Sequence, residues 1–279
     1  MSYLFYAAII PVIALGYYIY KKDTHSEPLE LLAKIFGMGC LTVIPVAILE
    51  LILGSFFPTE GIKNALLLFV NTFVSVALVE EGFKWIVTKK YGYNSNSFDE
   101  IYDIIVYSVF ASLGFACIEN ILYVFTGGLS VAFTRALLSI PGHTCFGVLT
   151  GFFLAKAKIN YNSGNNKLYN RNILLSLFIP MIGHTLYDFF LFLSSAFEKD
   201  SILIIFFIFY IVLVIICFRI VKRLSTVQQN ITTNVNDGTI IVPKEGNVVI
   251  NPTNSVCPIC GRNIGDYNYC PYCGVRLKK

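Results

Sequence analysis

Long apolar blocks separated by short polar segments dominate the chain. A helix that crosses a bilayer needs about 20 mostly apolar residues, and seven blocks are long enough. They cover residues 2–20, 31–57, 62–88, 101–126, 129–157, 171–195 and 201–221. The pattern predicts an all-α polytopic membrane protein with about seven transmembrane helices, whose first partner is the lipid bilayer.

The composition supports this fold class and excludes others. Of 279 residues, 56% are hydrophobic and only 14% are charged, against about 25% charged residues in an average soluble domain. The mean hydropathy of +0.67 excludes a disordered chain and argues against a soluble globular protein. The formal net charge of +4 is small and dispersed, which argues against nucleic acid as a partner.

The basic residues predict an orientation. If the seven helices alternate in direction, one face holds twelve Lys and Arg residues, whereas the other holds only Lys63 and Lys199. Because basic loops stay on the cytosolic side, we expect an external N-terminus and a cytosolic C-terminus. The twelve are Lys21, Lys22, Lys34, Lys89, Lys90, Lys156, Lys158, Lys167, Arg171, Arg219, Lys222 and Arg223.

The C-terminal tail differs from the rest of the chain. Residues 224–254, rich in Asn and Thr, are predicted to be a linker, and residues 255–279 to form a separate module. The module holds two CxxC pairs, which supply four thiolates for one structural zinc ion. It resembles a short zinc ribbon, which is a candidate contact for a cytosolic protein. A redox CxxC or two disulfides are the alternatives, but a reducing compartment disfavours disulfides. The four predicted ligands are Cys257, Cys260, Cys270 and Cys273.

Ionisable residues inside predicted membrane helices need an explanation, because each costs about 2.5–3.5 kcal/mol at the centre of the bilayer. In block 62–88, Glu80 and Glu81 precede Lys84 by four and three residues, so all three share one side of a helix. The lysine can hold one carboxylate ionised and leave the other free to act in a reaction. A buried ion pair that only fixes the helix register is the structural alternative.

Three further helices carry polar groups at similar depth. Glu119 and Asn120 lie in block 101–126, and His143 lies in block 129–157. His184 and Asp188, four residues apart in block 171–195, suit a carboxylate that orients an imidazole. The combination favours a functional site over scattered structural residues.

Two chemistries fit this cluster. Glu and His are both metal ligands, but no HExxH motif places two histidines and a glutamate on one helical turn. Alternatively, a carboxylate activates water, and a histidine donates hydrogen bonds to the developing oxyanion. Glu50 is interpreted as a packed or cavity-facing side chain, and Arg135 as a snorkelling or paired one.

The order of these motifs resembles a known family. Glu80-Glu81-x-x-Lys84, Phe115-x-x-x-Glu119-Asn120, His143 and His184-x-x-x-Asp188 follow one another on successive helices. This order closely resembles that of PrsW-type intramembrane proteases, which belong with the CAAX-processing and bacteriocin-processing membrane proteases. The resemblance covers residues 1–223, the predicted intramembrane protease domain, and does not include the tail.

The resemblance implies a role for each matching residue. Glu80 would be the base that activates the attacking water, with Glu81 assisting and Lys84 holding the pair. Glu119 stands where CAAX-type relatives have a histidine, so that either Glu119 or His143 would be the second partner of the water.

The remaining residues receive their roles in the same way. His184 would stabilise the oxyanion, and Asp188, which replaces an Asn of some relatives, would support it, as would Asn120 beside Glu119. The expected substrate is a single-pass membrane protein. The best-known task of the family it resembles is the first cut in a membrane-bound anti-sigma factor under envelope stress, which begins release of a sigma factor.

Two other classes of function remain open from the sequence. A transporter or channel would use the same residues to relay protons or bind ions, and it predicts an internal repeat with matching broken helices. A non-enzymatic receptor would use the tail to bind a partner, and it predicts that Glu80→Ala affects folding alone.

Overall fold

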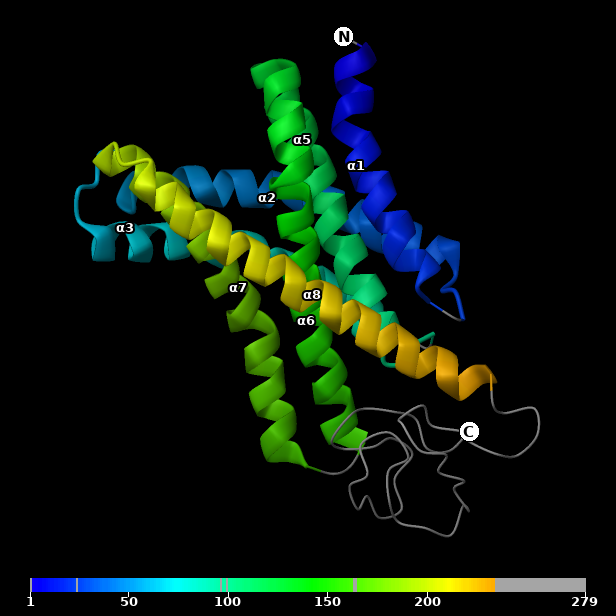
Figure 1. Ribbon diagram of the computed structural model, residues 1–279. Coiled ribbons are helices and arrows are strands. Elements are labelled where there is room, and N and C mark those ends of the chain that lie inside the picture. Colours follow the sequence, from blue (N-terminus) through cyan, green and yellow to red (C-terminus); the bar gives the residue numbers. More distant parts are fainter. Residues whose placement is uncertain (1, 24, 96, 99, 163–164, 234–279) are drawn as a thin grey trace.

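The computed structural model describes residues 2–23, 25–95, 97–98, 100–162 and 165–233, and within these ranges every regular element is helical (Figure 1). The expected all-α class is therefore confirmed for the described part. The predicted zinc ribbon and its four cysteines lie outside the described residues. The elements are α1 Ser2–Lys21, α2 Leu29–Phe56, α3 Ala65–Thr72, η1 Phe73–Ala77, α4 Leu78–Val87, η2 Thr88–Tyr93, α5 Asp103–Leu137, α6 Ser139–Asn162, α7 Asn166–Phe197 and α8 Ser201–Thr233.

Six helical stretches of the described chain are long and apolar enough to cross a membrane. The chain is a multi-pass integral membrane protein. The sequence predicted about seven spans, and the numbers differ because blocks 101–126 and 129–157 fall in one continuous stretch of 59 residues, Asp103–Tyr161. At the other end, α8 continues to Thr233, so the first ten residues of the predicted linker are helical.

The 59-residue stretch is not a straight rod. Gly128 has φ 74° and ψ −161°, a conformation that only glycine adopts readily. Fifteen residues of straight helix would separate Arg135 from Asn120 by about 22 Å, yet Arg135 Nε donates to Asn120 Oδ1 at 2.9 Å. The chain therefore reverses at Gly128, and residues 129–137 run back along α5 into α6 (Figure 1).

One continuous helical stretch contains α3, η1, α4 and η2. The two η segments are π-helical turns, in which the backbone hydrogen bonds reach one residue further than in an α-helix. They lie on either side of α4, which carries the predicted acidic pair. Such turns are frequent at functional sites.

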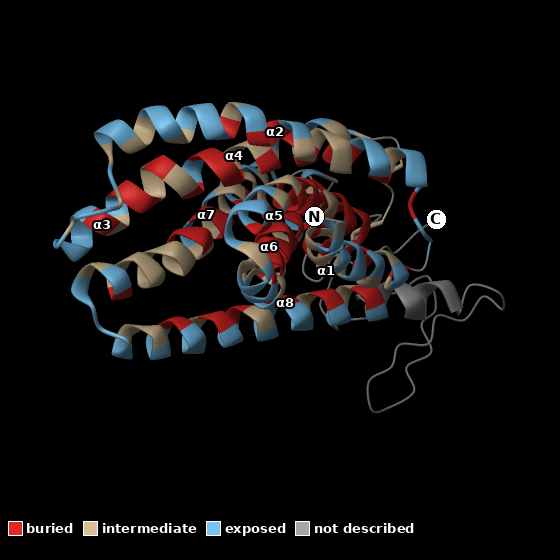
Figure 2. Ribbon diagram, turned by 90° about the horizontal axis from the view of Figure 1, so that it is seen from above, coloured by how far each residue is buried: buried red, intermediate tan, exposed pale blue. Residues whose placement is uncertain are grey.

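The central helix is α5, against which α1, α2 and α6 pack (Figure 2). Glycines allow this close approach. A Cβ at Gly39 of α2 would lie 2.2 Å from the carbonyl oxygen of Ala111, and one at Gly114 of α5 would lie 2.1 Å from that of Phe36. Gly151 of α6 packs in the same way against Ile105. Tight backbone packing over small residues is what holds helices together in lipid.

The outer helices expose their apolar side chains. Leu51 on α2 is 78% exposed and Ile204 on α8 is 63% exposed. In Figure 2 the buried residues concentrate on the inner sides of the helices, while the outer sides of α2 and α8 are exposed. This distribution suits lipid as the surrounding solvent.

Candidate active site

The acidic pair on α4 is held by a lysine of the same helix. Lys84 Nζ donates to Glu80 Oε2 and to Glu81 Oε1, at 2.8 Å in each case. All three residues are buried. The spacing of four and three residues places them on one side of α4, as the sequence suggested.

His143 of α6 extends the cluster. Its Nδ1 lies 3.0 Å from Lys84 Nζ, and its Nε2 lies 2.9 Å from Glu119 Oε2 on α5. An ammonium group has three N–H donors and no acceptor, so Lys84 donates to His143 Nδ1. In a neutral His143, Nε2 then carries the ring proton and donates a hydrogen bond to Glu119 Oε2. Three helices are thereby joined through one chain of hydrogen bonds.

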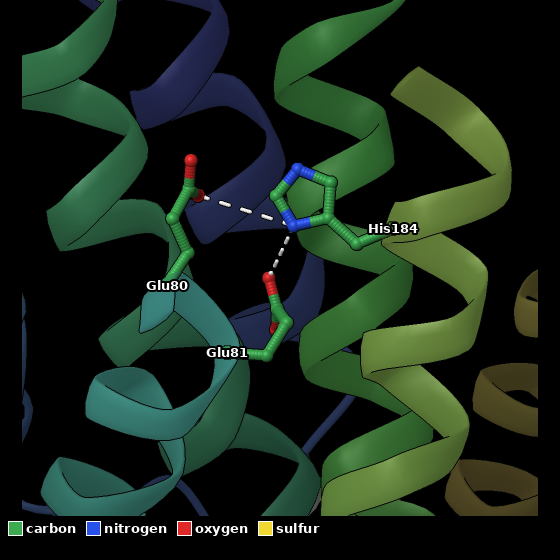
Figure 3. A group of neighbouring side chains, drawn as sticks. All are labelled: Glu80, Glu81 and His184. Atoms are coloured by element: carbon green, nitrogen blue, oxygen red, sulfur yellow. Dashed lines mark hydrogen bonds and ion pairs between the residues drawn. The ribbon is translucent and has the colours of Figure 1, made fainter. Parts of the chain in front are cut away.

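His184 of α7 lies among carboxylates. Its Nδ1 is 3.0 Å from Glu81 Oε1 and 3.9 Å from Glu80 Oε2, as the dashed lines in Figure 3 show. Its Nε2 is 3.2 Å from Asp188 Oδ2, one turn further along α7. The ring also stacks on Phe146, with centroids 4.8 Å apart. Because each nitrogen faces an acceptor, the position favours a ring that donates from both sides.

A second cation enters the site after the reversal at Gly128. Arg135 Nη2 donates to Glu119 Oε2 at 2.7 Å, and Arg135 Nε donates to Asn120 Oδ1. Asn120 Nδ2 in turn donates to the carbonyl oxygen of Ala8 on α1, at 2.7 Å. Asn120 thus ties the site to the first helix. Arg135 was interpreted from the sequence as snorkelling or paired, and the structure shows it paired with Glu119. That interpretation did not include Arg135 in the candidate site.

Most of these groups border a cavity of about 570 Å³. Glu81, Lys84 and Asn120 are not part of its wall and lie behind it. Of the acidic pair, only Glu80 faces the cavity, and its Oε1 takes part in no hydrogen bond or ion pair with another described residue. Besides Tyr123 and Tyr187, the ionisable residues of the wall are Glu50, Glu80, Glu119, Arg135, His143, His184 and Asp188.

Glu50 of α2 is a cavity residue to which the sequence assigned no function. Its Oε1 is buried and has no hydrogen-bond partner among the described residues. The only signal in the sequence was an acidic residue in an apolar block. The sequence interpretation of Glu50 as a packed or cavity-facing side chain includes the observed position. The choice between these two depended on the packing of α2, which the sequence does not specify.

The donor set of the site can be compared with the needs of a metal ion. Glu80, Glu81 and His184 each offer one ligand atom, and the three atoms lie within 4.8 Å of one another. Asp188 on the far nitrogen of His184 is the kind of outer partner that orients a metal-binding histidine. The residues therefore fit a divalent cation. Lys84, however, already places one positive charge against both carboxylates.

Comparison with known proteins agrees with the site. A profile of the PrsW-protease family, described as "PrsW family intramembrane metalloprotease", matches residues 27–216. Protease PrsW of Oceanobacillus iheyensis is 39% identical over 185 residues, which cover 66% of this chain and 81% of that protein. Protease PrsW of Bacillus subtilis is 37% identical over 186 residues, which cover 66% and 81%. No solved structure matches the chain.

A further relative, Protease PrsW of Geobacillus kaustophilus, is 38% identical over 189 residues, with 67% and 79% covered. The region that the family profile matches contains every residue of the cavity wall and excludes the tail. These findings favour a protease over the transporter and the receptor. The chain belongs to the PrsW family of intramembrane proteases.

Proposed function

We propose that this protein is an intramembrane endopeptidase in which Glu80 activates water to hydrolyse a peptide bond of a membrane-anchored protein. One observation carries the proposal. Glu80 faces the cavity with a free oxygen, while Lys84, which is itself paired with Glu81, holds its other oxygen from behind. A carboxylate fixed in this way is suited to take a proton from a bound water.

The reaction needs one proton acceptor and one charge stabiliser. Glu80 takes a proton from water, and the water oxygen attacks the carbonyl carbon of the substrate. The negative charge that develops on the carbonyl oxygen is stabilised by Arg135, which keeps N–H groups beyond those that bind Glu119 and Asn120. The positive charge of a doubly protonated His184, whose two N–H groups donate to Glu81 and Asp188, adds to this stabilisation. The C–N bond then breaks, and Glu80 passes its proton to the leaving amine nitrogen, which restores the carboxylate.

The supporting residues keep these groups in place. Asp188 and Glu81 fix the two nitrogens of His184. Glu119 holds His143 and Arg135 through one oxygen. A general base typically contributes about 10²–10⁴-fold to the rate, provided that it stays within hydrogen-bond reach of the water.

The family description names a metal, and Glu80, Glu81 and His184 are the residues that would hold it. Such an ion would polarise the carbonyl group and ease deprotonation of water. We favour the metal-free arrangement, because the ammonium group of Lys84 halves the negative charge that the two carboxylates offer a cation.

The proposal extends to topology and substrate. The stretch Asp103–Tyr161 crosses the bilayer twice, which gives seven crossings, an external N-terminus and a cytosolic C-terminus. The substrate is a single-pass membrane protein, and family membership makes an anti-sigma factor, cut at its first site, the leading candidate. The tail binds one structural zinc through its four cysteines and offers a contact to a cytosolic protein.

The test compares membrane-protein fragments in cells that carry the wild type or Glu80→Gln. This change keeps the shape of the side chain and removes the charge of the base. Fragments that depend on the enzyme should disappear while the protein still accumulates in the membrane. Glu60→Gln, in an exposed loop, is the matched control and should cleave like the wild type. Normal cleavage by Glu80→Gln would refute the proposed base.

A further inference from the structure

A second pocket lies between α6, α7 and α8, away from the active site. Its volume is about 460 Å³, and it shares no lining residue with the catalytic cavity. Lys156 on its wall comes 13 residues after His143 on the same helix, a separation of about 20 Å along the axis. The pocket is therefore a site of its own.

Four cations from three helices converge on this pocket. Lys156 comes from α6, Arg171 from α7, and Arg219 and Arg223 from α8. No Asp or Glu lines the pocket, and none of the ion pairs among the described residues involves any of the four. Lys156 instead lies over the ring of Phe152, at 4.3 Å from its centroid. Like charges gathered without counter-charges favour an anionic ligand.

The rest of the wall is mainly apolar. It includes Phe152, Ile159, Ile216 and Ile220. Ile216 is 45% exposed and continues into the apolar outer side of α8. A free inorganic anion gains nothing from such a wall, whereas an amphiphile with an anionic head and an apolar chain contacts both parts.

The four cations also lie at one level of the membrane helices. Arg171 is near the start of α7, Lys156 is near the end of α6, and Arg219 and Arg223 are near the end of the span that closes at Thr226. The ends of spans lie at the depth of lipid headgroups. All four belong to the basic face that the positive-inside rule assigns to the cytosol, where the leaflet is anionic.

We propose that this pocket binds the phosphate group of an anionic phospholipid of the cytosolic leaflet. The cations hold the phosphate, and an acyl chain lies along the apolar side of α8. Basic pockets between membrane helices bind lipid headgroups in this manner. The binding site is independent of the proteolytic role proposed above.

The experiment uses the full chain, purified in a neutral detergent. Dihexanoyl phosphatidylglycerol is the probe, and its binding is measured by native mass spectrometry. Dihexanoyl phosphatidylcholine has the same chains without net charge, and inorganic phosphate has the anion without chains. The pocket variant is Arg171→Gln with Arg223→Gln. The control is Lys167→Gln with Lys222→Gln, which removes two charges from the same helices outside the pocket.

The pocket variant should bind phosphatidylglycerol at least tenfold more weakly than the wild type, and the control should bind within about twofold of it. Phosphatidylcholine and phosphate should bind the wild type at least tenfold more weakly than phosphatidylglycerol. If both double variants lost phosphatidylglycerol binding to the same extent, the net charge of the protein would explain the binding, and the proposed site would be wrong. Phosphate binding as strong as lipid binding would overturn the lipid assignment. If the pocket variant does not fold, Arg171→Gln and Arg219→Gln singly, against Lys167→Gln, decide the question.

Discussion

Lys84 Nζ lies 2.8 Å from Glu81 Oε1, and neither side chain is more than 2% exposed. The pair is therefore shielded from water on α4, directly behind the carboxylate that faces the cavity. A buried pair is costly to break, because the remaining charge has no partner. Lys84 and Glu81 are therefore positioning residues, whereas Glu80 is the residue of this group that can contact a substrate.

The first prediction concerns Lys84. Lys84→Met should lower the free energy of unfolding by about 3–5 kcal/mol, because two carboxylates stay buried without their cation. Adding Glu81→Gln should restore part of the loss, since one of the two charges is then gone. Unfolding in detergent, monitored by circular dichroism, measures the stability of the single and the double variant. Lys90→Met, at an exposed position, is the control. Unchanged stability in Lys84→Met would show that the pair does not hold α4.

The second prediction concerns Arg135. Arg135→Gln should reduce cleavage by about 10²-fold, the usual effect of removing an oxyanion donor. Arg135→Lys should recover only part of the activity, because lysine cannot reach Glu119 and Asn120 with a planar fork. The measurement is turnover of a substrate found in the fragment comparison, alongside thermal stability. If turnover falls only in proportion to stability, Arg135 is a structural residue.

The third prediction tests the packing of α2 on α5. Gly39→Ala should destabilise the protein by about 1–3 kcal/mol, because its Cβ would meet the backbone of Ala111. Gly37→Ala, on the same helix with nothing within 4 Å, should be neutral or slightly stabilising. Thermal unfolding of the two variants in the same detergent measures this difference in stability. Similar effects at both positions would contradict the close approach of the two helices.

The fourth prediction concerns orientation. A reporter fused after Lys279 should read as cytosolic, and one inserted in the loop 197–200 should read as external. The reason is the split of basic residues between the two faces. Paired alkaline phosphatase and fluorescent-protein fusions provide the readout. An external C-terminus would reverse the proposed orientation and remove the argument against disulfides in the tail.

The fifth prediction separates two questions about metal. The purified protein should contain one zinc, and removal of residues 255–279 should eliminate it, because four thiolates form a closed site. The truncated protein should still cleave its substrate in the presence of a chelator. Metal content is measured by plasma mass spectrometry. Stoichiometric metal in the truncated protein, together with loss of activity on chelation, would make Glu80, Glu81 and His184 ligands.

Much of the fold could be predicted from the sequence, because each span is a long apolar run that leaves few alternatives to a helix. The candidate residues stood out for a related reason, since charges are rare at membrane depth. Arg135 was harder, because its contacts depend on a reversal at Gly128 that brings together residues 15 and 16 positions apart. Glu50 was interpreted as packed or cavity-facing, and the sequence could not decide between the two, because its apolar block shows no polar side.

The first π-helical turn, η1, sets the rotation of α4 about the helix axis relative to α3. A π-helical turn takes in an extra residue and so rotates α4 relative to its position in a plain α-helix. The exposed apolar side of Ala65–Thr72 and the side of Leu78–Val87 that carries Glu80 toward the cavity are thereby offset around the helix axis. Substitutions on the exposed side of Ala65–Thr72 therefore need not change the direction in which the carboxylates of Leu78–Val87 point. Deletion of one residue in Phe73–Ala77, by contrast, would rotate α4 about its axis, and with it Glu80 and Glu81, relative to the rest of the cavity wall.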